Sequence, residues 1–297
     1  MERRAYPSDL SEAEYAVLLP HLPRPAATGR PWKHGLREIL DGVFYVVRTG
    51  CQWRCLPHEY PPWQTVFWWF RRWRLDGTWD RLNAALLQRF RVRAGRQPQP
   101  SAGIIDSQSV KTSGVGGVRG FDGGKKVNGR KRHILVDTLG LVLTAAVHSA
   151  YIQDRAGVPL LLGGADRRFP RLEHVWVDQG YTGSGKQWIE EHLGWTVEVV
   201  QHPRTWSRGF LGVLDPAAPG GFRLEYSTVR GKKGFQGVLP RRWVVERTFS
   251  WLLHSRRLAR DYERLTETDE ALICATMSRL MTRRLARTAS APFSDSL

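Results

Sequence analysis

The spacing of apolar residues divides this 297-residue chain into a helical first third and a remainder that mixes helices and strands. Within about the first 95 residues, apolar positions recur every three or four residues, the period of a helix with one buried face. A capping box at Ser11-x-x-Glu14 predicts where the first helix begins, and Pro20 predicts where it ends. The pattern predicts four helices, at residues 11–19, 36–50, 63–74 and 78–90.

The pattern changes after Arg96-Gln-Pro-Gln-Pro-Ser101, a segment whose prolines predict a linker. Short apolar runs follow, and helical stretches separate the later ones, which predicts an α/β fold with a mixed sheet flanked by helices. A tight-turn signal at Thr138-Leu-Gly140 predicts an antiparallel hairpin. The expected strands are 104–105, 133–137, 141–147, 175–177 and 195–200, and the expected helices are 154–162, 186–192, 241–258 and 266–287.

These patterns predict two domains and a tail. Residues 1–97 are expected to form an all-α domain of the helix-turn-helix type, and residues 98–287 the α/β domain. A stretch rich in Gly, Pro and Arg, from about 201 to 238, is expected to interrupt the second domain as an irregular insertion with a short strand at Phe222–Tyr226. We expect the tail, residues 288–297, to be disordered.

The third predicted helix carries an aromatic stripe and a basic face. Trp63, Phe67 and Phe70 follow the helical period, so we expect them in the core. Three further tryptophans fall off this stripe and are expected to pack on the neighbouring domain: Trp68, Trp69 and Trp73. Short helices with one basic helix are typical of DNA-binding units, although arginines also commonly lie on a solvated face. The candidate DNA contacts on this helix are Arg71, Arg72 and Arg74.

The charge of the chain favours a polyanionic partner. Lys and Arg number 45 against 28 Asp and Glu, which gives a formal net charge of +17 and a pI near 10.5. Neutralising phosphates releases counterions, so nucleic acid is the partner that this excess favours. The 13 Trp residues and the large apolar fraction argue for packed cores and against a small basic ribosomal factor.

The cysteines and the apolar runs indicate a reducing, cytoplasmic setting. Three cysteines are an odd number and are widely separated, so no disulfide partner is expected. The pair Cys51-x3-Cys55, with His58 nearby, lacks a second pair at finger-like spacing, so zinc is not expected. The N-terminus lacks an apolar signal core, and no apolar run approaches the ~20 residues of a membrane span.

Three acidic residues have the local setting of a two-metal nuclease site. Asp106 and Asp178 each end an apolar run that predicts a strand, and Glu246 lies within a predicted helix. A carboxylate at the end of a strand lies at the sheet edge where open α/β sheets bind ligands. Mg²⁺ prefers hard oxygen ligands, and a metal-bound water attacks a phosphodiester near neutral pH. The three residues therefore predict a Mg²⁺ site that acts on nucleic acid.

Other acidic residues are expected to have structural roles or none. Asp137 precedes the predicted hairpin turn, Asp154 is expected to cap a helix, and Asp122 lies in a Gly-rich loop without a partner. That loop belongs to the stretch 111–133, which carries seven Lys or Arg and seven Gly. Because glycine lets a backbone come close to phosphate, we expect this stretch to contact DNA near Asp106. The candidates are Lys125, Lys126, Arg130, Lys131 and Arg132.

Arg242 precedes Glu246 by four residues, so one helical turn places both side chains on one face. Two roles are open at this point: an ion pair with Glu246, or a clamp on a phosphate beside the metal site. Further cations near Glu246 are candidate DNA contacts: Arg241, Arg256 and Arg257.

The motifs together resemble those of DDE transposases of bacterial insertion sequences, of the insertion-sequence-five group. The matching segments, which extend the resemblance from about Leu10 to Leu285, are Gly50-Cys-Gln-Trp-Arg-Cys-Leu-Pro57, Pro62-Trp-Gln-Thr-Val66, Ile105-Asp106-Ser-Gln-Ser-Val-Lys111, Gly123-Gly-Lys-Lys-Val-Asn-Gly-Arg-Lys-Arg-His133, Val177-Asp178-Gln-Gly-Tyr181 and Pro240-Arg-Arg-Trp-Val-Val-Glu246-Arg-Thr-Phe-Ser-Trp251. Each motif alone is weak, but their order and coverage make the combination specific.

The resemblance implies a ribonuclease-H-like catalytic domain in which Asp106, Asp178 and Glu246 hold two Mg²⁺ ions, with Mn²⁺ as a substitute. It also favours the phosphate-clamp role for Arg242, through the family's Arg-x3-Glu signature. The implied function is DNA transposition: binding terminal inverted repeats, cleaving the strands and joining them to target DNA, as a homodimer in a synaptic complex at the bacterial nucleoid. Leu239 and Leu253 depart from the Tyr and Lys of the related insertion-sequence-four signature, which leaves the excision route open.

Two other functions fit the same sequence. One is a catalytically silent DNA-binding protein derived from a transposase, which an intact acidic triad argues against. The other is a structure-specific nuclease that cuts DNA without strand transfer. Metal-dependent cleavage separates the first from a transposase, and joining of pre-cut ends separates the second.

Overall fold

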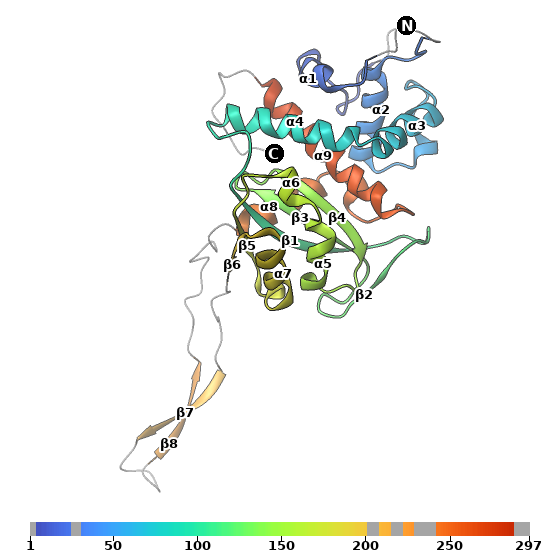
Figure 1. Cartoon of the computed structure of the whole chain (residues 1–297). Helices are drawn as coiled ribbons and strands as arrows, with labels where there is room; N and C mark the ends of the chain where they lie inside the picture. Colours follow the sequence, from blue (N-terminus) through green and yellow to red (C-terminus); the bar gives the residue numbers. More distant parts are fainter. Residues whose placement is uncertain (1–3, 25–30, 201–207, 215–221, 229–241, 288–297) are drawn as a thin grey trace.

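Helices gather at one end of the molecule, and a curled mixed sheet lies beside them (Figure 1). The computed structural model describes residues 4–24, 31–200, 208–214, 222–228 and 242–287, with 208–214, 222–228 and 242 described by their backbone alone. The last helix, α9 (Thr266–Ala286), returns from the sheet to lie among the helices of the first third of the chain. No helix in the described parts of the chain is both long and apolar enough to cross a membrane.

The four helices predicted for the first third are present: α1 (Glu12–Leu18), α2 (Leu36–Thr49), α3 (Trp63–Leu75) and α4 (Thr78–Arg93), with short 3-10 turns η1 (Leu19–His21) and η2 (Trp53–Cys55). The capping box of α1 forms as predicted. Ser11 Oγ accepts from Glu14 N at 3.2 Å, and Glu14 Oε2 accepts from Ser11 N at 2.9 Å. α2 ends at Gly50, whose φ of 73° is a left-handed conformation that favours glycine.

The aromatic face of α3 is broader than the predicted stripe. Phe70 is fully buried, but Trp63 and Phe67 are only half-buried. Trp69 and Trp73 were expected to pack on the neighbouring domain, but both lie in the core of the helices. The ring centroid of Trp73 is 5.4 Å from that of Trp79 on α4. The reason is that α2, α4, η2 and α9 all pack against α3, so more than one side of the helix is covered.

The sheet is built around β1 (Ala102–Lys111). This strand pairs antiparallel with β3 (Val127–Asp137) on one side and parallel with β5 (His174–Val177) on the other. The remaining strands are β6 (Thr196–Val199), parallel to β5, and β2 (Gly120–Asp122) and β4 (Val142–Ser149), both antiparallel to β3. The apolar runs predicted only the first part of β1 and the last part of β3, because backbone pairing continues through the polar parts of both strands as far as Lys111 opposite Gly129.

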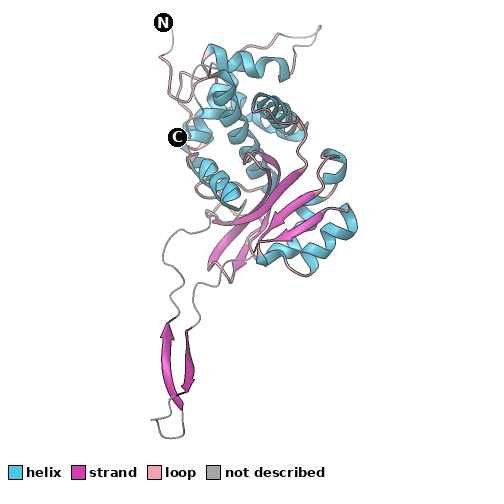
Figure 2. Cartoon of the chain, turned by 90° about the vertical axis from the view of Figure 1, so that its left-hand side faces the viewer, coloured by secondary structure: helices cyan, strands magenta, loops and turns pink. Residues whose placement is uncertain are grey.

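Helices cover both faces of the sheet, as predicted for the α/β part (Figure 2). Successive residues of β3 point to opposite layers. His133 faces α5, where a Cβ on Gly157 would lie 2.3 Å from His133 Cε1, whereas Arg132 faces α9 and pairs with Asp269. The helices are α5 (Asp154–Leu162), α6 (Ala165–Arg168), α7 (Ser184–Leu193), α8 (Arg242–Leu253) and α9, with η4 (Arg256–Leu258) after α8, which ends earlier than predicted.

The turn between β3 and β4 is held from two directions. Asp137, predicted to be a turn residue, accepts from Leu139 N and Leu141 N at 2.9 and 2.8 Å and forms a buried ion pair with Arg91 of α4. From α8, Thr248 Oγ1 donates to Gly140 O at 2.7 Å. Gly140 has a φ of 83°, and a Cβ there would lie 2.8 Å from Thr248 Oγ1. The turn therefore joins α4 of the helical region to α8.

The strand predicted at Phe222–Tyr226 is present as part of β8 (Phe222–Thr228), which pairs antiparallel with β7 (Arg208–Leu214). The rest of the predicted insertion, residues 201–207, 215–221 and 229–241, lies outside the described residues, as does the predicted tail, 288–297.

Candidate active site

Asp106 and Asp178 lie at the same level on neighbouring parallel strands. The last printed pair of the β1–β5 register is Ile104 opposite Trp176, and each aspartate follows two residues later. Neighbouring strands are about 4.8 Å apart, and residues two apart point to the same face, so both carboxylates belong to one face of the sheet. Asp178 directly follows β5, as predicted, but Asp106 lies in the middle of β1 and not at its end, because β1 continues to Lys111.

Both carboxylates are half-buried and have local backbone donors. Asp106 Oδ1 accepts from Ser107 N at 2.7 Å. Asp178 caps the 3-10 turn η3 (Gln179–Tyr181), where its Oδ1 accepts from Gly180 N at 2.8 Å. The fully buried hydroxyl of Tyr181 lies near both: burial, and then the charges of Asp106 and further carboxylates, raise the pKa of Tyr181 well above its usual value. Tyr181 therefore stays protonated and uncharged beside the two carboxylates.

Asp154 is a further carboxylate at this site, and the sequence assigned it only a capping role. The N-cap of α5 is Gln153, and Asp154 is the first helical residue. Its Oδ2 and Asp178 Oδ1 would lie 3.1 and 3.0 Å from a Cβ on Gly180, so these two oxygens are at most about 6 Å apart. Asp154 Oδ1 accepts from Ser107 Oγ and pairs with Lys131 Nζ, both at 2.8 Å. Burial raises the pKa of Asp154, but these two hydrogen bonds outweigh it and leave the pKa lowered.

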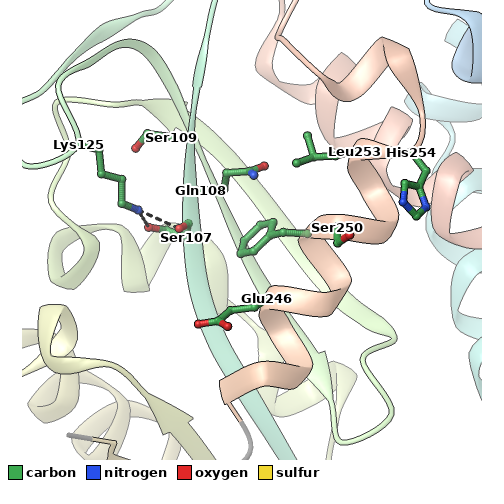
Figure 3. Close-up of a pocket in the computed structure, with 9 residues that line it drawn as sticks. Ser107, Gln108, Ser109, Lys125, Glu246, Ser250, Leu253 and His254 are labelled. Atoms are coloured by element: carbon green, nitrogen blue, oxygen red, sulfur yellow. Dashed lines mark hydrogen bonds between the residues drawn. The ribbon is translucent and has the colours of Figure 1, made fainter. Parts of the chain in front are cut away.

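Glu246 reaches the site from α8, which packs against β1. It lines a hollow of about 500 Å³ between that helix and the strand, and Figure 3 draws its carboxylate on the side of α8 that faces β1. Glu246 is exposed, whereas its neighbours Val244 and Val245 are buried and fix the rotation of the helix. The described residues that line the hollow are Ser107, Gln108, Ser109, Lys125, Glu246, Phe249, Ser250, Leu253 and His254.

The three predicted carboxylates suit a hard cation by their chemistry. Asp106 on β1, Asp178 after β5 and Glu246 on α8 carry anionic oxygens, the ligand type that Mg²⁺ takes. Among the residues that the structure describes, no three Asp, Glu, His or Cys side chains converge closely enough to form a complete metal-binding group. The described structure therefore does not by itself bring Asp106, Asp178 and Glu246 together as a metal-binding group, and the three remain predicted ligands.

Lys125 places a positive charge in the same hollow. Its Nζ donates to Ser107 O at 3.0 Å (Figure 3). The turn that carries it is organised by Asp122, whose Oδ1 accepts from Gly124 N and Lys125 N at 3.0 Å each. Asp122 was expected to have no partner, and this expectation is wrong: its other oxygen accepts from Ser109 Oγ at 2.5 Å. Lys125 is thus positioned to face an anion beside Glu246.

Several basic residues predicted to contact DNA are buried instead. The stretch 127–133 is not a flexible loop but the first part of β3. Arg130 is fully buried and pairs with Asp261 at 2.8 Å, and Arg132 pairs with Asp269. Lys131 is 4% exposed and pairs with Asp154. These three cations form ion pairs with carboxylates within the fold, so the expectation that they contact DNA is wrong.

Arg257 is also buried, 7% exposed, and pairs with Glu263 at 2.5 Å, which corrects its predicted role. The other candidates in the described chain stay accessible: Arg71, Arg72, Lys125, Lys126 and Arg256 are exposed, and Arg74 is half-buried. Arg72 stacks on the exposed Trp68 ring, with its Cζ 5.2 Å from the ring centroid. Arg241 lies outside the described residues. Arg242 is the first residue of α8, one turn before Glu246, and its side chain lies outside the described part.

Comparisons with known proteins agree with the order of these motifs. A family model described as "Transposase DDE domain" matches residues 97–281, and one described as "Putative transposase of IS4/5 family" matches residues 10–83. A curated relative from Burkholderia cepacia, the "Insertion element IS402 uncharacterized 16.2 kDa protein", is 38% identical over 82 residues, which are 27% of this chain. The chain spans about half, 54%, of the length of that relative. No solved structure matches the chain.

Proposed function

Because the chain belongs to the transposase DDE domain family and is a DDE transposase of IS4/5 type, we propose that it binds the terminal inverted repeats of an insertion sequence, cleaves them and joins them to target DNA. The family implies a DNA partner and dependence on a divalent metal in general terms. The observation that carries the finer proposal is the pair Asp106 and Asp178 at one level of neighbouring strands, with the Glu246 hollow beside them.

In this proposal Asp106, Asp178 and Glu246 hold two Mg²⁺ ions, which Mn²⁺ can replace. When bound, the metal supplies a Lewis acid and a water of lowered pKa. The protein's own side chains do the rest: the two aspartates present oxygens from a rigid sheet, and Glu246 approaches from α8 on the other side of the substrate. Lys125 neutralises phosphate charge in the hollow, and Arg242, one turn before Glu246, clamps a phosphate.

The order of the strands supports a ribonuclease-H-like catalytic fold. With the short β2 set aside, the sheet runs β4-β3-β1-β5-β6, antiparallel up to β1 and parallel beyond it. The first aspartate lies on the central strand and the second after the neighbouring parallel strand. This order supports the proposal that the two carboxylates act together on a bound substrate.

We assign the recognition of element ends to residues 1–97 and the chemistry to residues 98–287. The exposed Arg71 and Arg72 of α3, together with the stacked Trp68, support a helix-turn-helix-like contact with DNA. Two copies of the chain, one for each end, would form the synaptic complex at the nucleoid. The alternatives are a DNA-binding protein without catalysis and a nuclease without strand transfer.

One set of reactions tests the proposal. The full chain is incubated with a labelled duplex that carries one terminal repeat, with Mg²⁺ or with EDTA, and the products are separated on a denaturing gel. We expect cleavage at the repeat boundary only with the metal, and joining of a pre-cut end to a target duplex. Binding without cleavage would favour the silent DNA-binding protein, and cleavage without joining would favour the nuclease.

A further inference from the structure

A second hollow, beside the one that contains Glu246, has five arginines among the fourteen described residues that line it. It measures about 530 Å³ and lies where α2, α8 and α9 meet. Its charged lining residues are Arg48, His254, Arg279, Arg283, Arg284 and Arg287, and none of the described residues that line it is acidic. We call this hollow the arginine pocket. One of the five arginines comes from α2, and the other four come from α9 and the residue that follows it. Guanidinium groups gathered in one hollow favour the binding of an anion.

Packing holds three of these arginines in place. Arg284 stacks on Trp251 of α8, with its Cζ 4.3 Å from the ring centroid. Arg48 Nη1 donates to His254 O at 2.8 Å, and Arg279 Nη1 pairs with Glu14 at 2.8 Å. A guanidinium whose position is already fixed loses little entropy when it binds a phosphate, so these three form a prepared surface.

Glu14 pairs with two arginines of the pocket: it is bonded closely to Arg279 and lies 3.9 Å from Arg283. Burial, and then the charges of Arg279 and other arginines of the pocket, lower the pKa of Arg283. Arg283 and Arg284 lie in the last turn of α9 and Arg48 in the last turn of α2, where cations favour the helix dipoles, and the packing of the helices brings these two ends into one hollow. Like charges gathered in one hollow are unfavourable, and a bound polyanion would relieve their repulsion.

The arginine pocket adjoins the hollow that contains Glu246. His254 lines both the arginine pocket and the hollow that contains Glu246. Figure 3 shows Glu246 and His254 toward opposite ends of α8. Eight residues separate them, which is about 12 Å along a helix axis. A DNA duplex advances 3.4 Å per base pair, so three to four base pairs span this distance.

We propose that the arginine pocket binds phosphates of the DNA that extends from the carboxylate site past His254. The proposal rests on the DNA-cleaving function given above and adds the path that the bound DNA takes. A duplex fits better than a free phosphate or nucleotide, because only an extended polyanion can reach from the hollow of Glu246 past His254 into this pocket. The pocket therefore contributes affinity and register to the DNA without reading bases.

The test compares the full chain with an R283Q/R287Q double variant, which leaves the close Arg279–Glu14 pair intact. An R167Q/R171Q variant, with both arginines exposed and outside the two hollows, is the matched control. Binding of a pre-cut terminal duplex is measured by fluorescence anisotropy in EDTA over a range of NaCl concentrations, and melting temperatures confirm folding. We expect affinity to fall at least about tenfold in R283Q/R287Q, and the slope of log affinity against log salt to shrink by about two. In the R167Q/R171Q control, the changes in affinity and in salt slope should each be no more than about half of those in R283Q/R287Q.

Ethylation interference locates the contact. Ethylated phosphates about three to four base pairs from the cut site should block binding to the wild type and no longer matter for R283Q/R287Q. If that variant fails to fold, R48Q on α2 replaces it and should weaken binding through the same phosphates. The proposal is overturned if R283Q/R287Q shows the affinity and the interference pattern of the wild type. It is also overturned if inorganic pyrophosphate competes fully for the pocket while DNA binding by the variant stays unaffected. Cleavage by the wild type in Mg²⁺ is scored separately, so failure of the catalytic function and failure of this DNA path are distinguishable.

Discussion

Arg132 of β3 donates from Nε and Nη2 to the two carboxylate oxygens of Asp269 on α9, at 2.6 and 2.8 Å, with both side chains almost fully buried. Removing the guanidinium would leave a buried carboxylate without its partner, which costs about 3–5 kcal/mol. We expect R132M to lose that much free energy of unfolding in urea titrations. R132M/D269L should recover much of it, because both charges are then gone. The exposed R155A should cost less than about 0.5 kcal/mol, and a loss below about 1 kcal/mol in R132M would contradict this account.

We predict that D106N, D178N and E246Q each abolish metal-dependent cleavage and leave DNA binding within about threefold of the wild type. The amide replacements keep the shape of each side chain, so the fold should persist, while the oxygen charge that a divalent metal needs is lost. Cleavage gels and anisotropy on the same preparations check both halves of the prediction. Near-normal cleavage by any one variant would remove that residue from the proposed site.

Asp154 gives a contrasting prediction, because it is bonded to Lys131 and Ser107 within the fold. D154N should lower the melting temperature by several degrees, since it removes the closer of the two carboxylates that pair with the buried ammonium of Lys131 and leaves only Asp122, at 3.6 Å. If Asp154 only supports the site, cleavage under saturating metal should fall by less than about tenfold. A loss as complete as that of D178N would instead make Asp154 a ligand.

Arg242 distinguishes a phosphate clamp from a surface ion pair. If it clamps phosphate, R242A should slow single-turnover cleavage or strand transfer by about tenfold or more with a nearly unchanged melting temperature. R242K should restore only part of the rate, because an ammonium lacks the two-pronged contact of a guanidinium. A pair with Glu246 alone would contribute only a few tenths of a kcal/mol. Full activity of R242A would therefore establish that lesser role.

The exposed arginines of α3 should contribute to recognition of the element end. We expect R71E/R72E to weaken binding to a terminal repeat by about tenfold or more at about 0.1 M salt, with a smaller salt slope. The experiment uses the full chain, because α9 packs on α1, α2 and α4 and the first 97 residues lack that cover when isolated. Equal binding of wild type to repeat and random duplexes would make this region a scaffold instead of a reader.

The buried pair of His133 and His148 predicts loss of stability in mild acid. Burial, and then the charge of His148, lower the pKa of His133 to about 3, whereas an unfolded histidine titrates near 6.5. As the pH falls below about 6.5, the unfolded chain takes up a proton that the folded chain refuses, so stability decreases down to the folded pKa. At pH 5 the loss is about 2 kcal/mol. Between pH 7.5 and 5.0, the free energy of unfolding of H133N in urea should change by about 2 kcal/mol more favourably than that of the wild type.

Glu270 stabilises the fold as the pH falls, opposite to His133. The contribution of His133 is therefore read from the difference between the wild type and H133N. Burial raises the pKa of Glu270 to about 7, so the folded chain binds this proton first and gains relative stability as the pH falls toward the ordinary carboxylate range. The difference between wild type and H133N cancels that contribution. An identical pH effect in the two proteins would contradict the assignment to His133.

The sequence predicted those parts of the site that depend on local pattern. Asp178 follows an apolar run of four residues, and that run is β5, so the end of the strand was visible in the sequence. The length of β1 was not visible, because its outer half is mostly polar and is held by pairing with β3, whose partner residues lie 18 to 26 positions later. The position of Asp106 along its strand was therefore wrong even though its partner strand was anticipated.

Charge roles were harder to predict than strand positions. Arg130 and Arg132 lie in a Gly-rich basic stretch, which favours a loop, yet their partners Asp261 and Asp269 are more than 130 positions away. Asp154 was assigned to a helix cap because its contacts with Ser107 and Lys131 arise only when α5 covers the sheet. A single sequence carries no signal for such distant pairs, since each residue has an ordinary local explanation.

The β3–β4 turn sets a limit on how freely such proteins can exchange parts. Arg91 holds this turn from α4 and Thr248 holds it from α8, so a graft of the first 97 residues onto a relative's catalytic half would carry one side of the joint without the other. In such a chimera Arg91 comes from the graft, and the acceptor supplies the residue that pairs with it. The chimera should melt at a lower temperature than either parent, unless the acceptor has an acidic residue at the position of Asp137. Redesign of the outer face of α3 leaves both contacts in place, so we expect it to disturb the fold less than a transplant of the whole helical region.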